Sequence, residues 1–329
     1  MPDDRSAPNA ALDVLALGMM MGEVAPPRAG VAVGEAALVL FPSGSTTIFA
    51  MALARLGARV GIVSRVGADD LGRWMRRELE QAGIDTVAVA DVAGQLTPLA
   101  LASVDEAGRK AYAFYRFPGT SDPLATLRAA EVPDDALRRA RVFDVGEASL
   151  RDPALRDEAL ALMTRARALG LTVCYTPNYR PAAWRGGETE AIPAQRRALA
   201  DADLALMNAA EARLLAGVDD AAAATEAIAA LGPRVVAVTD GAEAILLATG
   251  GAVHRLPAVR AEVVFDIGAG DTFHAGFLAA WTAPLAAGDP DPLACARFAA
   301  HAAALKISRP PDPALLPTRD EVLAAMAGS

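Results

Sequence analysis

Residues 261–281, AEVVFDIGAGDTFHAGFLAAW, join an apolar strand-like run to an alanine-rich helix through Gly268-Ala269-Gly270-Asp271. Glycines let the chain turn tightly and let backbone N–H groups approach a ligand. The first N–H groups of a helix have no partners within the helix, and they lie at the positive end of its dipole. The stretch therefore predicts an anion site suited to a phosphoryl group, with Asp271 beside it to orient or deprotonate an attacking hydroxyl.

A plainer interpretation is that Asp271 only caps the helix and the glycines only make a turn, because short glycine motifs recur by chance. Two other nucleotide-binding motifs have less support. No GxGxxG follows an early strand, and no GxxxxGK motif followed by Ser or Thr occurs in the sequence. A Rossmann dehydrogenase and a P-loop enzyme are therefore both disfavoured.

Strand-like and helical patterns alternate along most of the chain. The helical spacing of TTIFAMALARLG (46–57) is followed by the apolar run ARVGIVSRVG (58–67), and the alternation is regular after about residue 130. Such alternation predicts an α/β fold with a doubly wound, mainly parallel sheet flanked by helices. Residues 19–43 and 96–117 break the rhythm with strands and turns. We expect them to form a small β-sheet lid over the carboxyl edge of the main sheet, where open α/β folds place ligands.

Composition disfavours several classes of protein. The chain has 329 residues, a formal net charge of −9 and a hydrophobic share of 53%. The negative charge counts against a nucleic-acid partner, and no uninterrupted apolar stretch approaches the roughly 20 residues that span a bilayer. Its two cysteines cannot make a disulfide framework, and residues 1–11 lack a signal-peptide pattern. We expect a disordered leader at 1–11, a single domain over 12–329 and a cytoplasmic location.

Six segments carry motifs that recur together in one enzyme family. They are SGSTTIFAMALARLG (43–57), VGADDLGRWMRRELEQAGID (66–85), YTPNYRPAAW (175–184), NAAEARLLAG (208–217), VTDGAEAI (238–245) and IGAGDTFHAGFLAAW (267–281). In this order they resemble the ribokinase-like (PfkB) carbohydrate kinases, over about residues 12–327, and their style is most similar to that of 2-keto-3-deoxygluconate kinases. The resemblance implies a ribokinase-like fold and ATP-dependent phosphorylation of a sugar hydroxyl.

The resemblance also assigns roles around the glycine turn. It implies that Asp271 is the catalytic base, which takes the proton of the acceptor hydroxyl. The turn at Gly268 and the backbone amides of Ala269, Gly270 and Asp271 would form the anion hole. Gly268 and Gly270 would contact ATP as well.

ATP and Mg²⁺ are the implied cofactors. Asn208 and Glu211, the NxxE box, would support Mg²⁺ and its water shell, which suits an ion that keeps several waters. Without the family, these two residues would be a strand-end cap and a solvated helix residue. Asn208, Thr239 and Gly241 would line the ATP phosphates, and Asp266 would bind a monovalent cation such as K⁺.

The resemblance places five further residues at the sugar. Arg116 and Arg180 match arginines that grip a carboxylate, and the planar fork of arginine suits bidentate binding. Glu23 would accept hydrogen bonds from sugar hydroxyls, and Gly44 and Asn178 would line the same pocket. The acceptor expected first is therefore 2-keto-3-deoxygluconate. The alternative is two surface arginines paired with nearby acids and a solvated glutamate.

Three departures from the family pattern leave the acceptor open. Ile48 stands where the family usually has Asn, Thr176 where it often has Asp, and Ser43 where the first motif glycine is usual. A fructokinase, a 5-dehydro-2-deoxygluconokinase or a nucleoside kinase would keep the same machinery, and a non-catalytic sugar or nucleotide sensor is a different class. An open sheet edge in the lid would favour a homodimer.

Overall fold

The computed structural model describes residues 11–26, 30–31, 34–104, 110–115, 122–283, 290–310 and 312–328. Arg116, predicted to bind the acceptor, lies outside these residues. So does the expected leader, except for residue 11.

Nine strands of the described chain form one large sheet in the order β13-β12-β11-β10-β9-β8-β1-β4-β5. Neighbours from β5 to β11 are parallel, and β12 and β13 form an antiparallel edge. The strands are β1 (Leu12–Leu17), β4 (Val60–Gly67), β5 (Val89–Val92), β8 (Ala140–Gly146), β9 (Thr172–Thr176), β10 (Leu204–Asn208), β11 (Val235–Asp240), β12 (Ala244–Thr249) and β13 (Ala252–Pro257).

Helices cover both faces of this sheet because alternate strand residues point to opposite faces. On one face, Leu15 and Leu17 of β1 belong to a core that includes residues of helices α3 (Asp134–Arg138) through α7. On the other face, Val14 and Ala16 belong to a second core that includes residues of α1, α2 and helices α8 through α10. The other bounds are α1 (Ser45–Arg55), α2 (Asp70–Gln81), α4 (Pro153–Ala168), α5 (Glu188–Ala200), α6 (Ala209–Ala216), α7 (Ala221–Ala229), α8 (Ala269–Trp281), α9 (Pro292–Ile307) and α10 (Arg319–Ala327). The predicted doubly wound, mainly parallel sheet is confirmed.

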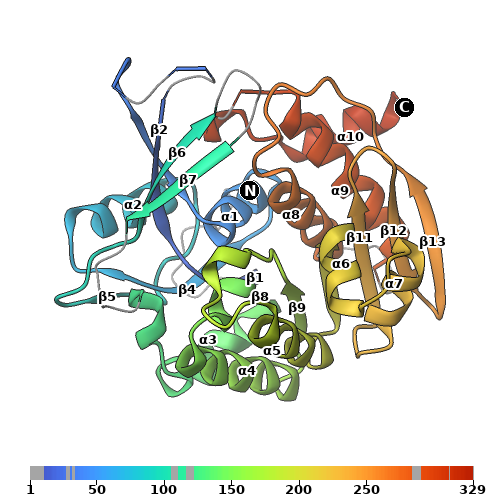
Figure 1. The fold of residues 1–329 in the computed structure, drawn as a ribbon, viewed down its shortest axis with the longest axis horizontal. Coiled ribbons are helices and arrows are strands. Elements are labelled where there is room, and N and C mark those ends of the chain that lie inside the picture. Colours follow the sequence, from blue (N-terminus) through green and yellow to red (C-terminus); the bar gives the residue numbers. More distant parts are fainter. Residues whose placement is uncertain are drawn as a thin grey trace.

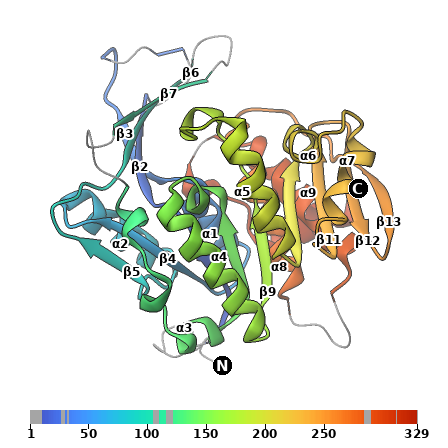
Figure 2. The same cartoon turned by 60° about the horizontal axis from the view of Figure 1, so that its bottom comes forward.

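A second, smaller sheet stands out from this body (Figure 2). Within the described residues it has four strands in the order β3-β2-β6-β7. They are β2 (Met21–Ala25), β3 (Val39–Ser43), β6 (Leu99–Val104) and β7 (Lys110–Tyr115). They come from the two segments that break the helical rhythm of the sequence. Since the chain passes from the carboxyl end of β1 almost directly into β2, the small sheet borders the carboxyl edge of the large one.

The start of α1 fits closely against the exit of β1. A Cβ atom added at Gly18 would lie 1.8 Å from Thr46 Oγ1, so no side chain can be accommodated there without a shift. In the centre of the molecule α8 lies between α1 and α9 (Figure 1). Both α1 and α8 begin at the edge that faces the small sheet. Among the described residues no helix is long and apolar enough to cross a membrane.

Candidate active site

The predicted anion site is the first turn of α8. Gly268 precedes the helix with φ 81°, a left-handed conformation that favours glycine. Ala269 N donates to Asp266 O at 3.2 Å, and Thr272 N to Gly268 O at 2.9 Å. A Cβ atom added at Gly270 would meet nothing within 4 Å. The N–H of Ala269 is therefore already bonded, and the N–H groups of Gly270 and Asp271 are the ones left for an anion site.

Asp271 lies in that turn and is held by α1. Ser45 Oγ, from the first turn of α1, donates a hydrogen bond to Asp271 Oδ1. Burial raises the pKa of the Asp271 carboxyl, whereas the Ser45 hydrogen bond and the charges of His274, Arg180 and Lys306 act in the opposite direction. A carboxyl group with a raised pKa is a stronger base. Ser45 was not predicted as a site residue, although it stands in the SGSTT motif at a helix start.

Residues of the small sheet approach Asp271 from the other side. Glu23 is 7% exposed, and its Oε2 accepts a hydrogen bond from Ser43 Oγ at 2.5 Å. Its burial makes the predicted alternative of a solvated glutamate wrong, and burial also raises its pKa. Ser43, which replaces the usual glycine, is therefore the partner of Glu23.

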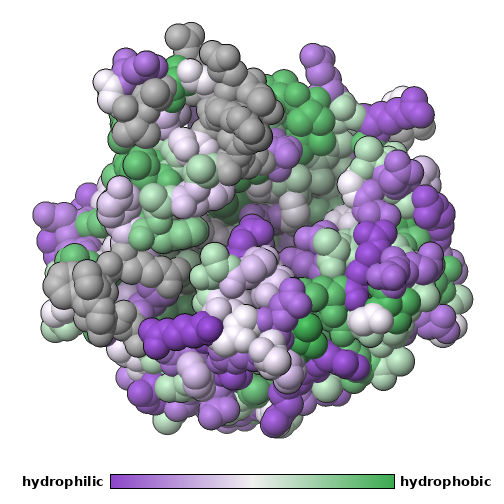
Figure 3. Space-filling view, viewed as in Figure 1, coloured by the Kyte–Doolittle hydropathy of each residue, from purple (hydrophilic) through white to green (hydrophobic). Residues whose placement is uncertain are grey.

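Tyr112 of β7 faces both groups of residues. Burial, then the negative charges of Glu23, Asp266 and Asp271, raise the pKa of Tyr112 to about 12, while the charge of Arg180 opposes them. The charges of these four residues therefore act together on one tyrosine of the small sheet. The space-filling view shows this face hollowed between the two parts (Figure 3).

The aromatic wall of this site was not predicted. The rings of Tyr112 and Phe114 stack with centroids 6.1 Å apart, and both residues are only partly covered, with Tyr112 41% and Phe114 54% exposed. The alternation in KAYAFY (110–115) was the available signal, because residues two apart share one face of a strand.

The loop after β9 carries Asn178 and Arg180. Asn178 has φ 40°, a left-handed conformation that asparagine tolerates better than most residues. Arg180 is exposed, and its charge acts on both Asp271 and Tyr112. Gly44, at the start of α1, has φ 91°, and a Cβ atom there would lie 2.9 Å from Met19 O. The backbone conformation and the close approach of Met19 therefore require glycine at position 44.

Ile48, which stands where the resembled family usually has asparagine, packs against the first turn of α8. Its Cγ2 would lie 3.4 Å from a Cβ atom added at Gly268. The side chain is partly buried between α1 and the start of α8. This position supplies apolar support for the turn where other members of the resembled family offer a hydrogen bond.

The predicted nucleotide residues lie at the carboxyl ends of β10 and β11. Asn208 pairs with Thr239 in the sheet register, and Gly241 follows in the turn to β12 with φ 56°. The exposed Asn208 is placed to face a ligand.

Glu211 is buried, so the alternative of a solvated helix residue is wrong. Asn208 Oδ1 accepts from Glu211 N at 2.9 Å, and Glu211 Oε2 accepts from Asn208 N at 2.9 Å. Glu211 Oε1 accepts from Tyr179 N at 2.7 Å. The NxxE box is therefore a capping box that also holds the loop of Arg180. Because both carboxylate oxygens accept backbone N–H groups, Glu211 fits an indirect role near Mg²⁺ better than direct coordination.

Removing the Glu211 carboxylate is expected to destabilise the fold. In Glu211→Ala the N–H groups of Asn208 and Tyr179 lose their acceptors in a buried place, which should lower the free energy of unfolding by about 2 kcal/mol. The comparison variant is Glu321→Ala, because Thr318 and Glu321 form the same capping box at the exposed start of α10, where Glu321 also makes a surface ion pair with Arg309 that contributes little. That variant should lose about 1 kcal/mol or less. Urea unfolding of both variants measures the difference, and equal losses would contradict the bridging role of Glu211.

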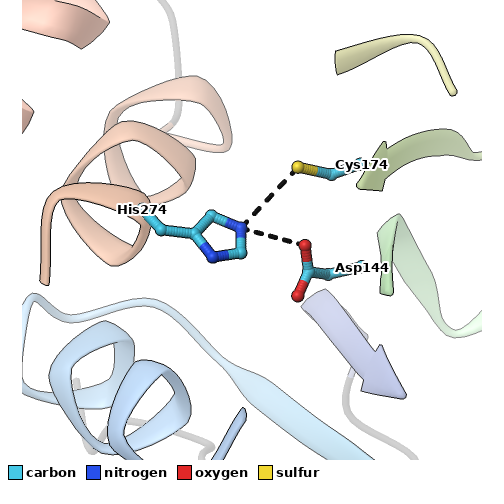
Figure 4. Close-up of side chains that lie close together, drawn as sticks. All are labelled: Asp144, Cys174 and His274. Atoms are coloured by element: carbon cyan, nitrogen blue, oxygen red, sulfur yellow. Dashed lines mark hydrogen bonds and ion pairs between the residues drawn. The ribbon is translucent and has the colours of Figure 1, made fainter. Parts of the chain in front are cut away.

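A buried polar cluster lies around His274, one turn of α8 after Asp271. His274 points from α8 toward β8 and β9 (Figure 4), with Nε2 2.9 Å from Asp144 Oδ1 and 3.6 Å from Cys174 Sγ. Its ring stacks on Phe49 of α1 at a centroid distance of 4.1 Å. Thr176, where the resembled family often has Asp, places Oγ1 3.3 Å from His274 Nδ1. His274 thus anchors the first turns of α8 to three other elements.

The cluster has donors that a metal could use, since the ligand atoms of Asp144, Cys174 and His274 lie within 4.8 Å of one another. A thiolate is the form of cysteine that binds metal. Burial, followed by the charge and hydrogen bond of Asp144, raises the pKa of the Cys174 thiol well above its usual range. We therefore interpret the cluster as a polar anchor with a protonated thiol. Sequence spacing held no sign of it, because Cys174 and His274 are 100 residues apart.

Comparisons with known proteins show which family and which solved structures the chain is similar to. Residues 11–319 match the pfkB family carbohydrate kinases. Fructokinase-1 of Oryza sativa subsp. japonica is 34% identical over 207 residues, which span 63% of this chain and 63% of the rice protein, less than two thirds of its length. Fructokinase of Klebsiella pneumoniae is 30% identical over 79% of this chain and 82% of its own. The structure of the Xylella fastidiosa fructokinase with bound ATP superposes with a TM-score of 0.85 at 25% identity, covering 96% of this chain and 98% of that one.

Proposed function

The chain belongs to the pfkB family of carbohydrate kinases, and we propose that it transfers the γ-phosphoryl group of ATP to a hydroxyl of a ketohexose such as fructose. One observation carries the proposal. Asp271 lies in the first turn of α8, beside the open N-terminus and opposite the Glu23 and Tyr112 side chains of the small sheet. A base, an anion site and a polar acceptor wall therefore meet at one place.

The proposed reaction follows from these groups. The acceptor hydroxyl lies against Asp271, which takes its proton as the oxygen attacks phosphorus. The N–H groups of the first turn of α8 stabilise negative charge on the transferring group. Mg²⁺, when bound, would neutralise part of the phosphate charge. The exposed Asn208, which is held by Glu211, is the residue that would bind the water shell of the ion. The small sheet acts as a lid that excludes water from the acceptor.

A neutral acceptor is preferred over the sugar acid expected from the sequence. The curated relatives are named fructokinases, which favours the alternative that the sequence left open. The buried carboxyl group of Glu23, paired with Ser43, suits sugar hydroxyls and gains nothing from a second carboxylate nearby. Arg180 acts on Asp271, so its charge also has a use that does not require an acidic acceptor.

A sugar panel tests the proposal through ADP release. Fructose should give the highest kcat/KM among fructose, 2-keto-3-deoxygluconate, 5-dehydro-2-deoxygluconate and adenosine. Arg180→Met should lower kcat/KM for fructose by about tenfold or less, because no paired carboxylate is lost. Arg185→Met, at an exposed position in the same loop, is the control. A preference for the sugar acid, lost by about 100-fold in Arg180→Met, would overturn the ketohexose assignment. The absence of ADP release with every acceptor in the panel would favour the non-catalytic sensor.

A further inference from the structure

Lys306 is a buried lysine at the end of α9. It is 7% exposed, and Lys110 is the other lysine in a chain whose 31 basic residues are otherwise arginines. Lysine in the last turn of a helix usually keeps its ammonium group in water, where it complements the helix dipole. Here Nζ donates a hydrogen bond to Phe265 O at 3.2 Å and lies 4.9 Å from the centroid of the Phe265 ring. The ammonium group is therefore directed inward, at one main-chain carbonyl group.

That carbonyl belongs to the loop that leads into the catalytic turn. Val264 N and Phe265 N both donate to Ile307 O, at 2.8 and 3.0 Å, so the loop is joined to the end of α9. The Cε atom of Lys306 would lie 3.7 Å from a Cβ atom added at Gly268. The charge of Lys306 also lowers the pKa of Asp271. Lys306 thus places a positive charge beside the anion site from outside the acceptor pocket.

This position bears on the monovalent cation expected near Asp266. Protein sites for K⁺ are built from main-chain carbonyl oxygens, and an ammonium group carries the same single charge and donates to the same oxygens. The main-chain carbonyl of Asp266 accepts a hydrogen bond from Ala269 N, and the main-chain carbonyl of Phe265 accepts one from Lys306 Nζ. The ammonium group therefore already binds one of the carbonyl oxygens that a free cation beside Asp266 would use.

We infer that the ammonium group of Lys306 is a built-in replacement for a monovalent cation, which holds the loop before α8 and keeps a positive charge beside the anion site. Phosphoryl transfer by this chain then needs no K⁺. The inference rests on the proposed function for its kinetic consequences, but its consequences for cation binding are independent of the acceptor.

The first test uses the unaltered protein. At constant ionic strength, kcat should change by no more than about twofold when tetramethylammonium is replaced by Na⁺ or K⁺, the range expected from general salt effects. A saturable activation by K⁺ of about tenfold or more would overturn the inference, whatever the acceptor.

The second test removes the charge. Lys306→Met keeps the length and apolar stem, and it should lower kcat by about 10- to 100-fold through the lost electrostatic stabilisation. K⁺ should recover part of that loss, and tetramethylammonium should not. Arg297→Met, at an exposed position on the same helix, removes an equal charge and should leave kcat unchanged. Lys306→Gln keeps an N–H donor without the charge, so it should resemble Lys306→Met if the charge matters.

A third measurement does not require turnover. If the methionine variant gains a cation site, K⁺ but not tetramethylammonium should raise its unfolding temperature, because a ligand that binds only the folded state stabilises it. The unaltered protein should show no such difference. A folded Lys306→Met protein that responds to K⁺ in neither kcat nor unfolding temperature would reduce Lys306 to a packing role and overturn the inference. If turnover fails with every sugar while the cation response appears, the proposed function is wrong and this inference stands.

Discussion

Asp271→Asn is expected to lower kcat by about 10²- to 10⁴-fold, the range that a positioned general base contributes. Asparagine keeps the shape of the side chain and can still bond Ser45, but it cannot take a proton. Binding of ATP should persist, because the first-turn N–H groups of α8 and the ends of β10 and β11 are unchanged. Turnover by rapid product assay and ATP affinity by calorimetry measure the two effects separately.

The control is Asp320→Asn, which alters an exposed aspartate in the first turn of α10 and should leave kcat unchanged. A further check uses pH. Because burial raises the pKa of Asp271 above its ordinary value of 3.8, the carboxyl group is protonated and inactive below that raised pKa. The activity should rise as pH passes upward through it, and this acidic limb should be absent from the residual activity of Asp271→Asn. Retention of more than about a tenth of the turnover would contradict the assignment of the base.

Gly270→Val is expected to lower kcat/KM for ATP by about 100-fold or more, comparable with the loss of a donor from an anion hole. The position has open space on its ligand side, since a Cβ atom would meet nothing within 4 Å. A branched side chain should therefore fold without a clash and occupy the volume that the phosphoryl group needs. Stability should change by less than about 1 kcal/mol, the scale of the helix propensity difference.

Ala222→Val is the matched control, because it places valine in the exposed first turn of α7, away from the site. Its kinetics should be unchanged, and its small loss of stability calibrates that of Gly270→Val in chemical unfolding. Normal ATP kinetics in a folded Gly270→Val protein would show that the phosphoryl group does not pass over the start of α8.

The fold could be predicted because it is encoded locally. Strand and helix patterns alternate within a few residues, and the segments that form the small sheet were recognisable as the ones that break this alternation. Glu211 marks the limit of that approach. Its capping box with Asn208 is readable from an NxxE spacing, whereas its burial depends on Tyr179, which only the folded chain brings to it.

The missing site residues are those set by long-range packing. Ser45 and His274 have partners on other elements of the fold. The residues next to Cys174 in the sequence give no indication that it lies beside His274. Lys306 could have been noticed from composition alone, since lysine is so rare in this chain. The inward direction of its side chain could not have been predicted, because a lysine near a helix end is ordinarily solvated.

The hydrogen bond between Ser45 and Asp271 joins residues 226 positions apart. During synthesis the small sheet and the start of α1 emerge long before Asp271 and the first turn of α8. Contacts of such high sequence separation form late, because chain entropy opposes them until most of the core is in place. A nascent or truncated chain that ends before α8 therefore carries Glu23 and Tyr112 without Asp271, the proposed base. The proposed phosphoryl transfer needs residues from both halves of the chain to meet, so we expect an incompletely folded molecule to consume no ATP.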